Sequence, residues 1–478
     1  MDLLMAFKLL DMAQQRWRRL DGAHLLPLVR AGTGILLFLV VSSAYYISPI
    51  RYSYDSSYSL LMDEAILQHG TPNLLCYQVG RGRGGNFSNH GYLYMIDLVK
   101  GRLLYIFPWG GALLSLPAVA ALNVGGLEVA PHGIYNAGND LKMQTVIATV
   151  LCAGIIWIFY QAANALLPIP WSLGLALSAA FATPIWSTAS RSLWAQTWYL
   201  FLISLVIWLL ISNRMRPVLL GTLLGWAYFV CPQSLPAIVL ISLYVLVEYK
   251  PKYFAAFVFT GAAWAVAAAG TMIFFFAHLL PPSYQAQVFD FRHGLMRLAG
   301  LLLSPSRGLF VFVPIVLLPL YVMIRYWSVF PRKRLALLAL AVIVSHIVIT
   351  ALWGAAWWGG WSYGPRLLIE TVPWFVLLAI LGVRTFLDKP VLSYQRFALV
   401  GVAAALLFVS VAINAVGAFS QAANDWNGVP NIDFNPDRVW DWRHPQFLAW
   451  LTSPESWPRV SDKRSSQKRG RKVISRTH

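Results

Sequence analysis

Long apolar runs, separated by short polar connectors, fill the sequence from about residue 31 to residue 417. A helix needs about 20 such residues to cross a bilayer. Hydrophobic residues make up 58% of the 478 residues and charged residues only 12%, which does not suit a water-soluble surface. The sequence therefore predicts an all-α polytopic integral membrane protein.

Hydropathy divides these runs into eleven predicted transmembrane helices. The first covers residues 31 to 48, and residues 143 to 417 hold the rest of the bundle. The later spans are predicted at residues 143–165, 171–187, 193–211, 217–232, 234–248, 253–278, 308–324, 335–353, 367–383 and 397–417. Residues 1 to 30 carry Lys8 and several arginines, and this basic segment is too long for a cleaved signal peptide. We expect it to be a cytoplasmic amphipathic N-terminus.

The positions of the basic residues predict which connectors face the cytoplasm. With a cytoplasmic N-terminus, the inward connectors hold Arg214, Arg216, Lys250, Lys252, Arg325, Arg332, Lys333, Arg334, Arg384, Lys389 and Arg396. This pattern requires that the apolar stretch at residues 107 to 125 does not cross, and Pro108 and Pro117 favour an interfacial helix there.

Two extracytoplasmic regions follow from this topology. Residues 49 to 142 form a large first periplasmic loop with interfacial helices, and residues 418 to 478 form a periplasmic C-terminal segment. The topology does not explain the basic tail of that segment, from Lys463 to Arg476. The outer loops are otherwise compact, which favours a bacterial inner (plasma) membrane with the site on the periplasmic side.

Motifs for several kinds of chemistry are missing from the sequence. There is no C-x-x-C, no H-E-x-x-H and no Walker loop, which argues against a zinc enzyme and an ATP-driven pump. Cys152 and Cys231 lie in apolar segments and leave Cys76 alone, so no disulfide scaffold is predicted. The net charge of +18 is assigned first to inward connectors, and no nucleic-acid partner is expected.

Asp55 follows the first span directly, in the segment Arg51-Tyr-Ser-Tyr-Asp55. Behind it, residues recur on one helical face: Tyr58, Leu61, Met62, Ala65 and His69. Two interpretations of Asp55 remain open. It is the N-cap of this helix, accepting amide hydrogens of the first turn, or a general base at the membrane surface. Asp63 and Glu64, in the middle of the helix, are expected to be solvated or structural.

Two short outer connectors each present one arginine beside hydroxyl groups. Arg191 lies between Ser190 and Ser192, and Arg307 follows Ser304-Pro-Ser306. Guanidinium binds phosphate oxygens in a bidentate manner, which suits both arginines to a lipid phosphate. The alternative is an arginine that snorkels to lipid headgroups.

The stretch from Gly101 to Pro117, which includes Arg102 and Tyr105, is predicted to form a turn followed by an apolar helix in the headgroup layer. This helix either contributes residues to the site or only rests in the membrane without chemistry of its own, and both interpretations stay open.

The segment Trp353-Gly-Ala-Ala-Trp-Trp358-Gly359-Gly360-Trp361-Ser-Tyr363-Gly-Pro-Arg366 is the most distinctive in the chain. An aromatic belt at the interface explains tryptophans but not paired glycines. Gly359 and Gly360 allow sharp backbone turns that present indole faces to a sugar ring or an isoprenoid. Both interpretations are kept, the belt and the binding loop.

Taken in this order and on one side, these residues resemble the membrane-embedded GT-C glycosyltransferases of bacteria. That family uses polyprenyl-phosphate sugars and includes the dolichyl-phosphate-mannose and aminoarabinose transferase relatives. The resemblance covers nearly the whole chain. It rests on an acid after the first span, Tyr58-x-x-Leu61 through His69-Gly70, Tyr105-x-x-Pro108-x-Gly110, Pro184-Ile-Trp186, Ser190-Arg191-x-Leu-Trp194, Ser304-Pro-x-Arg307-Gly308 and Trp357 through Arg366.

The resemblance implies the GT-C fold and a catalytic base in the first outer loop, which falls on Asp55. Many relatives have a second acid beside that base, whereas Ser56 follows Asp55 here. No cofactor is therefore assigned with certainty, no metal ligand is named, and a divalent cation is left open. Relatives often have Arg-Pro near the outer end of the fifth span, where this chain reads Cys231-Pro232-Gln233.

The predicted reaction moves a sugar from a polyprenyl-phosphate donor to a hydroxyl of an envelope glycolipid or polysaccharide, with inversion. Asp55 takes the hydroxyl proton, and Arg191, Arg307 and Arg366 jointly neutralise the leaving phosphate. Further donor-binding candidates are Arg102, His90, Tyr58, Tyr105, Trp358, Trp361 and Tyr363. A monomer in the lipid bilayer is expected.

Other functional classes stay open as alternatives. A transporter, flippase or polymerase of isoprenoid-linked glycans handles the same ligand, but transporters tend to place charges in mid-span and to repeat halves of the fold. Neither feature is evident in the sequence. A structural subunit that binds an envelope complex through its basic tail needs no catalytic acid.

Overall fold

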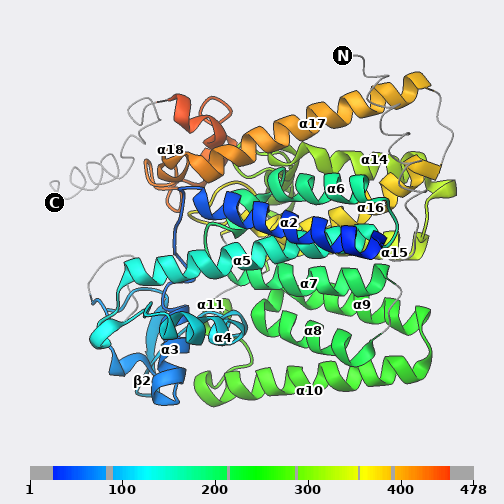
Figure 1. Ribbon diagram of the computed structural model, residues 1–478. Helices are drawn as coiled ribbons and strands as arrows, with labels where there is room; N and C mark the ends of the chain where they lie inside the picture. The colour runs from blue at the N-terminus through cyan, green and yellow to red at the C-terminus, as the bar shows by residue number, and fades with distance from the viewer. Residues whose placement is uncertain are drawn as a thin grey trace, which may run out of the picture.

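The computed structural model describes residues 25–81, 90–212, 216–285, 289–353, 356–388 and 393–452. Helices hold 72% of the residues and strands 4%, which confirms a mostly helical chain. Figure 1 shows most of the helices lying side by side in one bundle. Most of the basic N-terminus, Arg214, Lys389 and the basic C-terminal tail lie outside the described residues.

In the described part of the chain, six helices are long and apolar enough to cross a membrane. They are Leu26–Ile47 within α2 (Leu25–Ile47), α5 (Ala137–Asn164), α10 (Pro251–Phe276), α15 (Lys333–Leu352), Arg366–Asp388, which joins η7 (Arg366–Thr371) to α16 (Val372–Asp388), and Tyr394–Phe419 within α17 (Ser393–Phe419). These helices support the prediction of a polytopic membrane protein. The other apolar helices are shorter, and include α6 (Ile169–Phe181), α7 (Ala195–Ile211), α8 (Pro217–Val230), α9 (Leu235–Glu248) and α14 (Leu317–Arg325).

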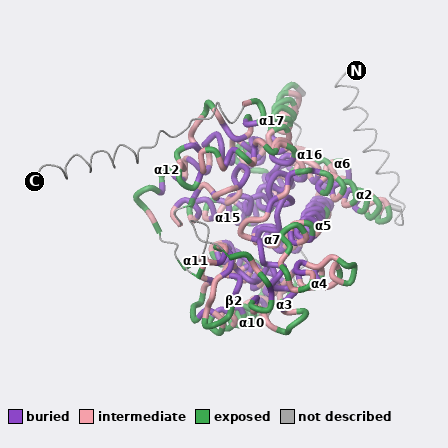
Figure 2. Tube along the Cα trace, turned by 90° about the vertical axis from the view of Figure 1, so that its left-hand side faces the viewer, coloured by how far each residue is buried: buried purple, intermediate pink, exposed green. Residues whose placement is uncertain are grey.

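The long helices divide into inner and outer ones. Only 17% of the apolar windows of α2, α10 and α17 is buried, against 72% for α5. The outer helices carry exposed apolar side chains such as Phe259 on α10 and Phe408 on α17. Figure 2 shows α2, α10 and α17 at the rim of the bundle around a buried centre. Apolar residues on an outer face suit contact with lipid rather than with water.

Glycines allow α8 to pack closely against α10. A Cβ added to Gly221 would lie 2.5 Å from Phe257 O, and one added to Gly225 would lie 2.5 Å from Trp264 Cβ. Gly221 and Gly225 are one helical turn apart, so both face α10. Small residues at this spacing let two helix backbones approach closely, as is common between membrane helices.

The loop between α2 and α5 contains one short β-hairpin, which the sequence analysis did not predict within this mostly helical chain. Strands β1 (Ile96–Val99) and β2 (Arg102–Tyr105) pair antiparallel, with Ile96 opposite Tyr105 and Val99 opposite Arg102. The two turn residues, Lys100 and Gly101, have φ of 49° and 73°. Positive φ at both positions matches the twist of a two-residue hairpin. The predicted turn at Gly101 is therefore the hairpin turn, and β2 comes before the apolar helix.

Two helices of the same loop pack against each other. They are α3 (Ser59–His69) and α4 (Gly110–Val124). A Cβ added to Gly110 would lie 2.5 Å from Val230 N, so the start of α4 touches the end of α8. Figure 1 places α3, α4, β2 and α18 (Gln421–Asp425) at the same end of the bundle. We call this end the α3 end, and Figure 2 looks onto it.

The two acids in the middle of α3 are both fully buried, so neither is solvated. Glu64 is structural, because its carboxylate accepts hydrogen bonds from Val129 N (2.7 Å) and Ala130 N (3.0 Å). Neither oxygen of Asp63 has a hydrogen-bond partner among the described residues. Burial raises the pKa of Asp63 well above its ordinary value of 3.8, so the fold favours the protonated form of this carboxyl.

Replacing Asp63 should therefore change how stability depends on pH. The native state keeps a proton that the unfolded chain releases, so the free energy of unfolding falls by about 1 kcal/mol per pH unit between the two pKa values. We expect Asp63→Asn to match the wild type below about pH 4, where the unfolded chain also keeps the proton, and to be more stable near pH 8, with the sign set by the raised pKa. Thermal unfolding in detergent across that range measures it. Parallel pH profiles for the two proteins would contradict the burial of an unpaired acid.

The C-terminal segment folds back onto the tryptophan-rich loop, residues 356 to 366. After α17 it contains α18, η8 (Pro436–Trp440) and η9 (Gln446–Leu451). The buried side chains of Asn427 and Gln446 both donate to Ser362 O, at 3.2 and 2.9 Å. Residues 420 to 452 and the tryptophan-rich loop therefore form one packed unit at the α3 end.

Candidate functional site

A cavity of about 470 Å³ lies at the α3 end. Its walls come from segments far apart in the sequence: residues 54–56, 94, 105–108, 194–196, 233, 283–284, 353–367 in part, and 431–433 in part. Of the residues that the structure describes, three with charged side chains line it, Asp55, Arg366 and Asp433. Most of these segments are connectors between helices, so the bundle brings its loops together around one cavity.

Asp55 is held at this cavity by three contacts. Its Oδ2 lies 2.7 Å from Arg366 Nη2, and its Oδ1 accepts from the Tyr94 hydroxyl at 2.9 Å. The Tyr105 hydroxyl donates to the main-chain carbonyl of Asp55 at 2.6 Å. The Asp55 side chain keeps 26% of its surface exposed. A carboxylate fixed in this way is oriented and still reachable from the cavity.

The structure contradicts the N-cap interpretation of Asp55. Helix α3 begins at Ser59, and its N-cap residue is Tyr58 in the left-handed conformation, with φ of 69° and no side-chain cap. Asp55 lies three positions before Tyr58, and its carboxylate binds Tyr94 and Arg366 instead. Residues 55 to 58 form a turn before α3 starts, which the sequence pattern does not reveal.

Arg366 joins Asp55 to an aromatic wall. Its guanidinium carbon lies 3.9 Å above the centre of the Trp194 ring, in a cation–π contact. Nη2 binds Asp55, whereas the buried Nε has no hydrogen-bond partner in the described chain. A buried N–H without a partner costs about 1–3 kcal/mol. Arg366 is thus a cation at the cavity with donor capacity left over for an anion.

Two further buried polar groups of the cavity wall also lack partners. They are Trp194 Nε1 and Ser283 Oγ, neither of which has a hydrogen-bond partner within the described residues. Gln196 and Gln233 add amide groups to the same wall. Donors without partners, grouped around one cation, are suited to binding an anion.

Gly364 and a buried His–Glu pair hold the backbone on either side of Arg366. Gly364 has φ of 60°, and a Cβ there would lie 2.6 Å from the Phe312 ring. His346 Nε2 donates to Leu367 O at 2.8 Å, which ties α15 to the residue after Arg366. His346 Nδ1 lies 3.5 Å from Glu370 Oε2, inside the bundle. The short helix η7 that begins with Arg366 is therefore anchored on its inner side.

The tryptophan-rich loop turns at its glycines, as predicted. Gly359 and Gly360 have φ of 77° and 61°, which favours glycine at both positions. Trp353 and Trp361 line the cavity, and Trp361 packs edge-on against Tyr54 with ring centres 6.2 Å apart. The glycines therefore allow the turns that place Trp361 at the cavity wall.

Sequence reasoning missed Asp433, Asn431 and Tyr94 as cavity residues. Asp433 Oδ1 accepts from Trp358 Nε1 at 3.2 Å, and Asn431 Oδ1 from Trp361 Nε1 at 3.4 Å. Burial and the charge of Asp55 raise the pKa of Tyr94, so its hydroxyl remains a donor to that carboxylate. Nothing in the sequence around Asp433 indicates that this segment folds back onto a loop about 70 residues earlier.

Arg191 does not line the cavity. Its guanidinium is fully buried and donates to the main-chain carbonyls of Tyr45, Ser48 and Ile50, just after or at the end of α2. Burial lowers the pKa of Arg191 to about 10. Every one of its three side-chain nitrogens already has an acceptor, because Nε donates to Ser190 Oγ. In this structure Arg191 fixes the end of α2 rather than offering donors to a ligand.

Arg307 is occupied in the same way. Its guanidinium donates to the carbonyls of Trp358, Ser306 and Gly360, and to the side chains of Gln446 and Asn427. Burial is the main reason that the pKa of Arg307 is lowered, to about 9. The structure thus separates the three arginines predicted to act jointly, and only Arg366 reaches the cavity.

The other predicted residues divide between wall and surroundings. Tyr105 and Trp361 line the cavity, whereas Trp358 does not line it but donates to Asp433, which does. Tyr58 is stacked on Tyr135, and the Tyr363 hydroxyl donates to Ile413 O, so both are structural. Arg102 lies over Phe274 and Phe275, and His90 pairs with Asp97 at 2.7 Å. Neither Arg102 nor His90 lines the cavity.

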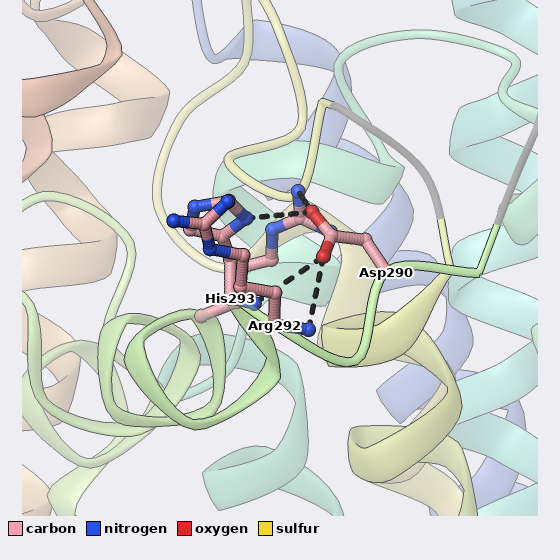
Figure 3. A network of polar contacts seen from close by, with 4 residues as sticks. Asp290, Arg292 and His293 are labelled. Atoms are coloured by element: carbon pink, nitrogen blue, oxygen red, sulfur yellow. Dashed lines mark hydrogen bonds and ion pairs between the residues drawn. The ribbon is translucent and has the colours of Figure 1, made fainter.

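A second polar cluster lies before α12 (Gly294–Leu303) and is shown in Figure 3. Asp290 accepts from the backbone N–H groups of Arg292 and His293, from His293 Nδ1 (2.8 Å) and from Arg297 Nη2 (2.7 Å). These hydrogen bonds, led by that from His293, lower the pKa of Asp290. The cluster closes the turn that starts α12 and does not line the cavity.

Comparisons with known proteins add no assignment. No family model matches the chain, and no curated protein matches it. Across the described residues, no group of three His, Cys, Asp or Glu side chains is arranged to hold a metal ion.

Proposed function

We propose that this protein is an integral membrane glycosyltransferase of the GT-C type. It moves a sugar from a polyprenyl-phosphate-linked donor to a hydroxyl of a cell-envelope acceptor. The observation that carries the proposal is the Asp55–Arg366 pair, 2.7 Å apart, at a cavity whose wall contains unpartnered donors and several aromatic rings.

The reaction needs the two groups that this pair provides. The acceptor oxygen forms a bond to the anomeric carbon while the bond from that carbon to the phosphate oxygen breaks. The acceptor proton goes to the Asp55 carboxylate, and the electron pair of the broken bond stays on the lipid phosphate. Arg366 then faces an additional negative charge, which its guanidinium neutralises. A single displacement of this kind inverts the anomeric configuration.

The aromatic wall suits the other parts of the donor. Trp353, Trp361 and Tyr54 line the cavity and offer ring faces and edges to a sugar or to the first isoprene units. Phe107 and Pro108, next to the start of α4, add apolar surface beside Asp55. Polar donors near Arg366 and apolar rings around them match an amphiphile with a phosphate in the middle.

The proposal includes eleven spans with the cavity on the extracytoplasmic side of a bacterial inner membrane. The arginines of the predicted inward connectors support this topology, because they bind groups at the ends of other helices. Arg332 donates to Leu210 O and Ile211 O at the end of α7, Arg334 pairs with Glu248 at the end of α9, and Arg384 donates to Leu166 O after α5. Basic residues gathered in this way fit the cytoplasmic side.

One observation favours the alternative, a transporter or flippase of isoprenoid-linked glycans. Glu370 and His346 form a buried ionisable pair inside the bundle, and such pairs are common in membrane transporters. The present structure uses the pair to anchor the Arg366 segment, through the bond from His346 to Leu367 O. The two functions differ in chemistry, since a transporter leaves the sugar–phosphate bond intact.

Release of lipid phosphate separates the two. We expect the purified protein in lipid nanodiscs to convert a polyprenyl-phosphate sugar to polyprenyl phosphate in the presence of an envelope glycolipid acceptor. Mass spectrometry of the lipids follows both substrate and product. Binding of the donor without any lipid-phosphate release, across a panel of sugars and acceptors, would favour the transporter.

A further inference from the structure

We infer that Asp433 and Asn431, with Trp361, form the subsite for the donor sugar, and that this subsite selects sugars that present hydrogen-bond donors and carry no acidic group. The inference rests on the proposed function, because it names the sugar class for the same cavity. It concerns the wall supplied by the C-terminal segment, whereas the proposed phosphate site is at Arg366.

Asp433 has one carboxylate oxygen engaged and one available. Oδ1 accepts from Trp358 Nε1 at 3.2 Å, and no partner of Oδ2 lies among the residues that the structure describes. The residue is exposed and lines the cavity. Gly360 lies next to it, since a Cβ there would be 3.8 Å from Asp433 Oδ1. An oriented carboxylate oxygen at a cavity wall accepts hydrogen bonds from ligand O–H or N–H groups.

A buried cation lies near this carboxylate without forming a hydrogen bond to it. The charge of Arg307 is close enough to interact with Asp433, and all three nitrogens of Arg307 donate to other acceptors. Arg307 therefore provides Asp433 with favourable charge but with no hydrogen bond. The cation that does line the cavity, Arg366, is paired with Asp55. Asp433 thus remains an acceptor that the protein leaves for a ligand.

Trp361 gives the subsite an aromatic surface. Its indole N–H donates to Asn431 Oδ1 at 3.4 Å, and its ring packs on Gly428, where an added Cβ would lie 3.0 Å from Trp361 Cη2. Asn431 Oδ1 also accepts from Asp433 N at 2.9 Å, so one amide orients both residues. Its Nδ2 has no partner within the described chain. The aromatic ring suits the apolar C–H groups of a sugar, and the neighbouring carboxylate and amide suit its hydroxyl groups.

The charges decide which sugars fit. Asp55 and Arg366 neutralise each other, so Asp433 gives this wall a negative character. A hydroxyl or ammonium group of the sugar satisfies the free oxygen of Asp433. A uronic acid places a second carboxylate at the same wall, and like charges in a partly buried site repel. The subsite therefore favours neutral or amino sugars over acidic ones.

Binding measurements on the full-length protein in nanodiscs test this inference. Three probes are compared: polyprenyl-phosphate glucose, polyprenyl-phosphate glucuronate and polyprenyl phosphate without a sugar. A hydrogen bond to a carboxylate corresponds to a factor of about ten or more, so the wild type should bind the glucose donor about tenfold more tightly than the bare lipid phosphate. The glucuronate donor should bind no more tightly than the bare lipid.

Asp433→Asn keeps the shape of the side chain and removes its charge. We expect this variant to lose the preference for the glucose donor over the bare lipid phosphate, which it should bind as the wild type does. The difference in affinity between the glucose and glucuronate donors should become about tenfold smaller. Asp437→Asn is the matched control, because the exposed Asp437 in η8 does not line the cavity, and it should change none of these affinities. Unfolding temperatures of both variants exclude a folding defect.

The outcomes separate the two proposals. A wild-type protein that binds no polyprenyl phosphate overturns the proposed function and the sugar subsite with it. A protein that binds all three lipids equally retains its lipid-phosphate site and overturns only the sugar subsite. An Asp433→Asn variant with the wild-type sugar preference also overturns the subsite alone.

Discussion

Asp55→Asn should lower the rate of sugar transfer by about 10²- to 10⁴-fold, the usual contribution of a general base. Asparagine has nearly the same shape and can still accept a hydrogen bond from the Tyr94 hydroxyl, but its amide does not take up a proton. Donor binding should change much less, because Asp55 acts on the acceptor hydroxyl. The rate is followed as lipid-phosphate release at saturating donor.

Folding is expected to survive this change. The Asp55 side chain is 26% exposed, and a partly exposed ion pair contributes only about 1 kcal/mol. Asp97→Asn is a matched control from the same loop, since Asp97 pairs with His90 outside the cavity. Full transfer activity in Asp55→Asn, measured beside an unaffected Asp97→Asn, would remove Asp55 from the role of base.

Arg366→Gln should weaken use of the donor by about 10²- to 10³-fold in kcat/KM, as for other groups that stabilise charge in a transition state. The variant loses the charge beside Asp55, the contact with the Trp194 ring and the unpartnered Nε donor. Arg366→Lys should recover only part of the loss, because an ammonium group lacks the planar fork of guanidinium. Measuring kcat/KM for the donor and for the acceptor separately shows whether only donor use is impaired.

Arg307→Lys is the contrasting variant. Lysine cannot replace the hydrogen bonds from Arg307 to the carbonyls of Trp358 and Gly360, and each bond from a charged donor contributes about 1.5–3 kcal/mol. We expect a lower unfolding temperature and less folded protein, with specific activity retained in the folded fraction. A donor-specific defect in Arg307→Lys without loss of stability would contradict its structural role. For Arg366→Gln, an unchanged dependence of the rate on donor concentration would contradict the phosphate role of Arg366.

Part of this fold and site can be predicted from sequence because its signals are local. Apolar runs long enough to cross a bilayer are visible without a structure, and six of the described helices have that length and composition. The glycines at 359 and 360 predict sharp turns, which their positive φ values confirm. Asp55 is placed near the membrane surface by its position after the first apolar helix. Local periodicity and turn chemistry carry all of this information.

What was missed depends on contacts between distant segments. Asp433 reaches the cavity only because the C-terminal segment folds back onto the tryptophan-rich loop. Arg191 and Arg307 look like phosphate ligands beside serines, but backbone carbonyls of other loops already occupy their N–H groups. The hairpin at Lys100 and Gly101 is hidden by its apolar neighbours, which also suit a helix.

A cryo-EM structure of the protein with bound polyprenyl phosphate would test the proposed site most directly. We expect the phosphate in the cavity, within hydrogen-bond distance of Arg366 and close to the buried groups Trp194 Nε1 and Ser283 Oγ. Asp55 should remain beside it and face the opening left for an acceptor. A phosphate bound at Arg191 or Arg307, or at any surface away from Asp55, would contradict the assignment of this cavity.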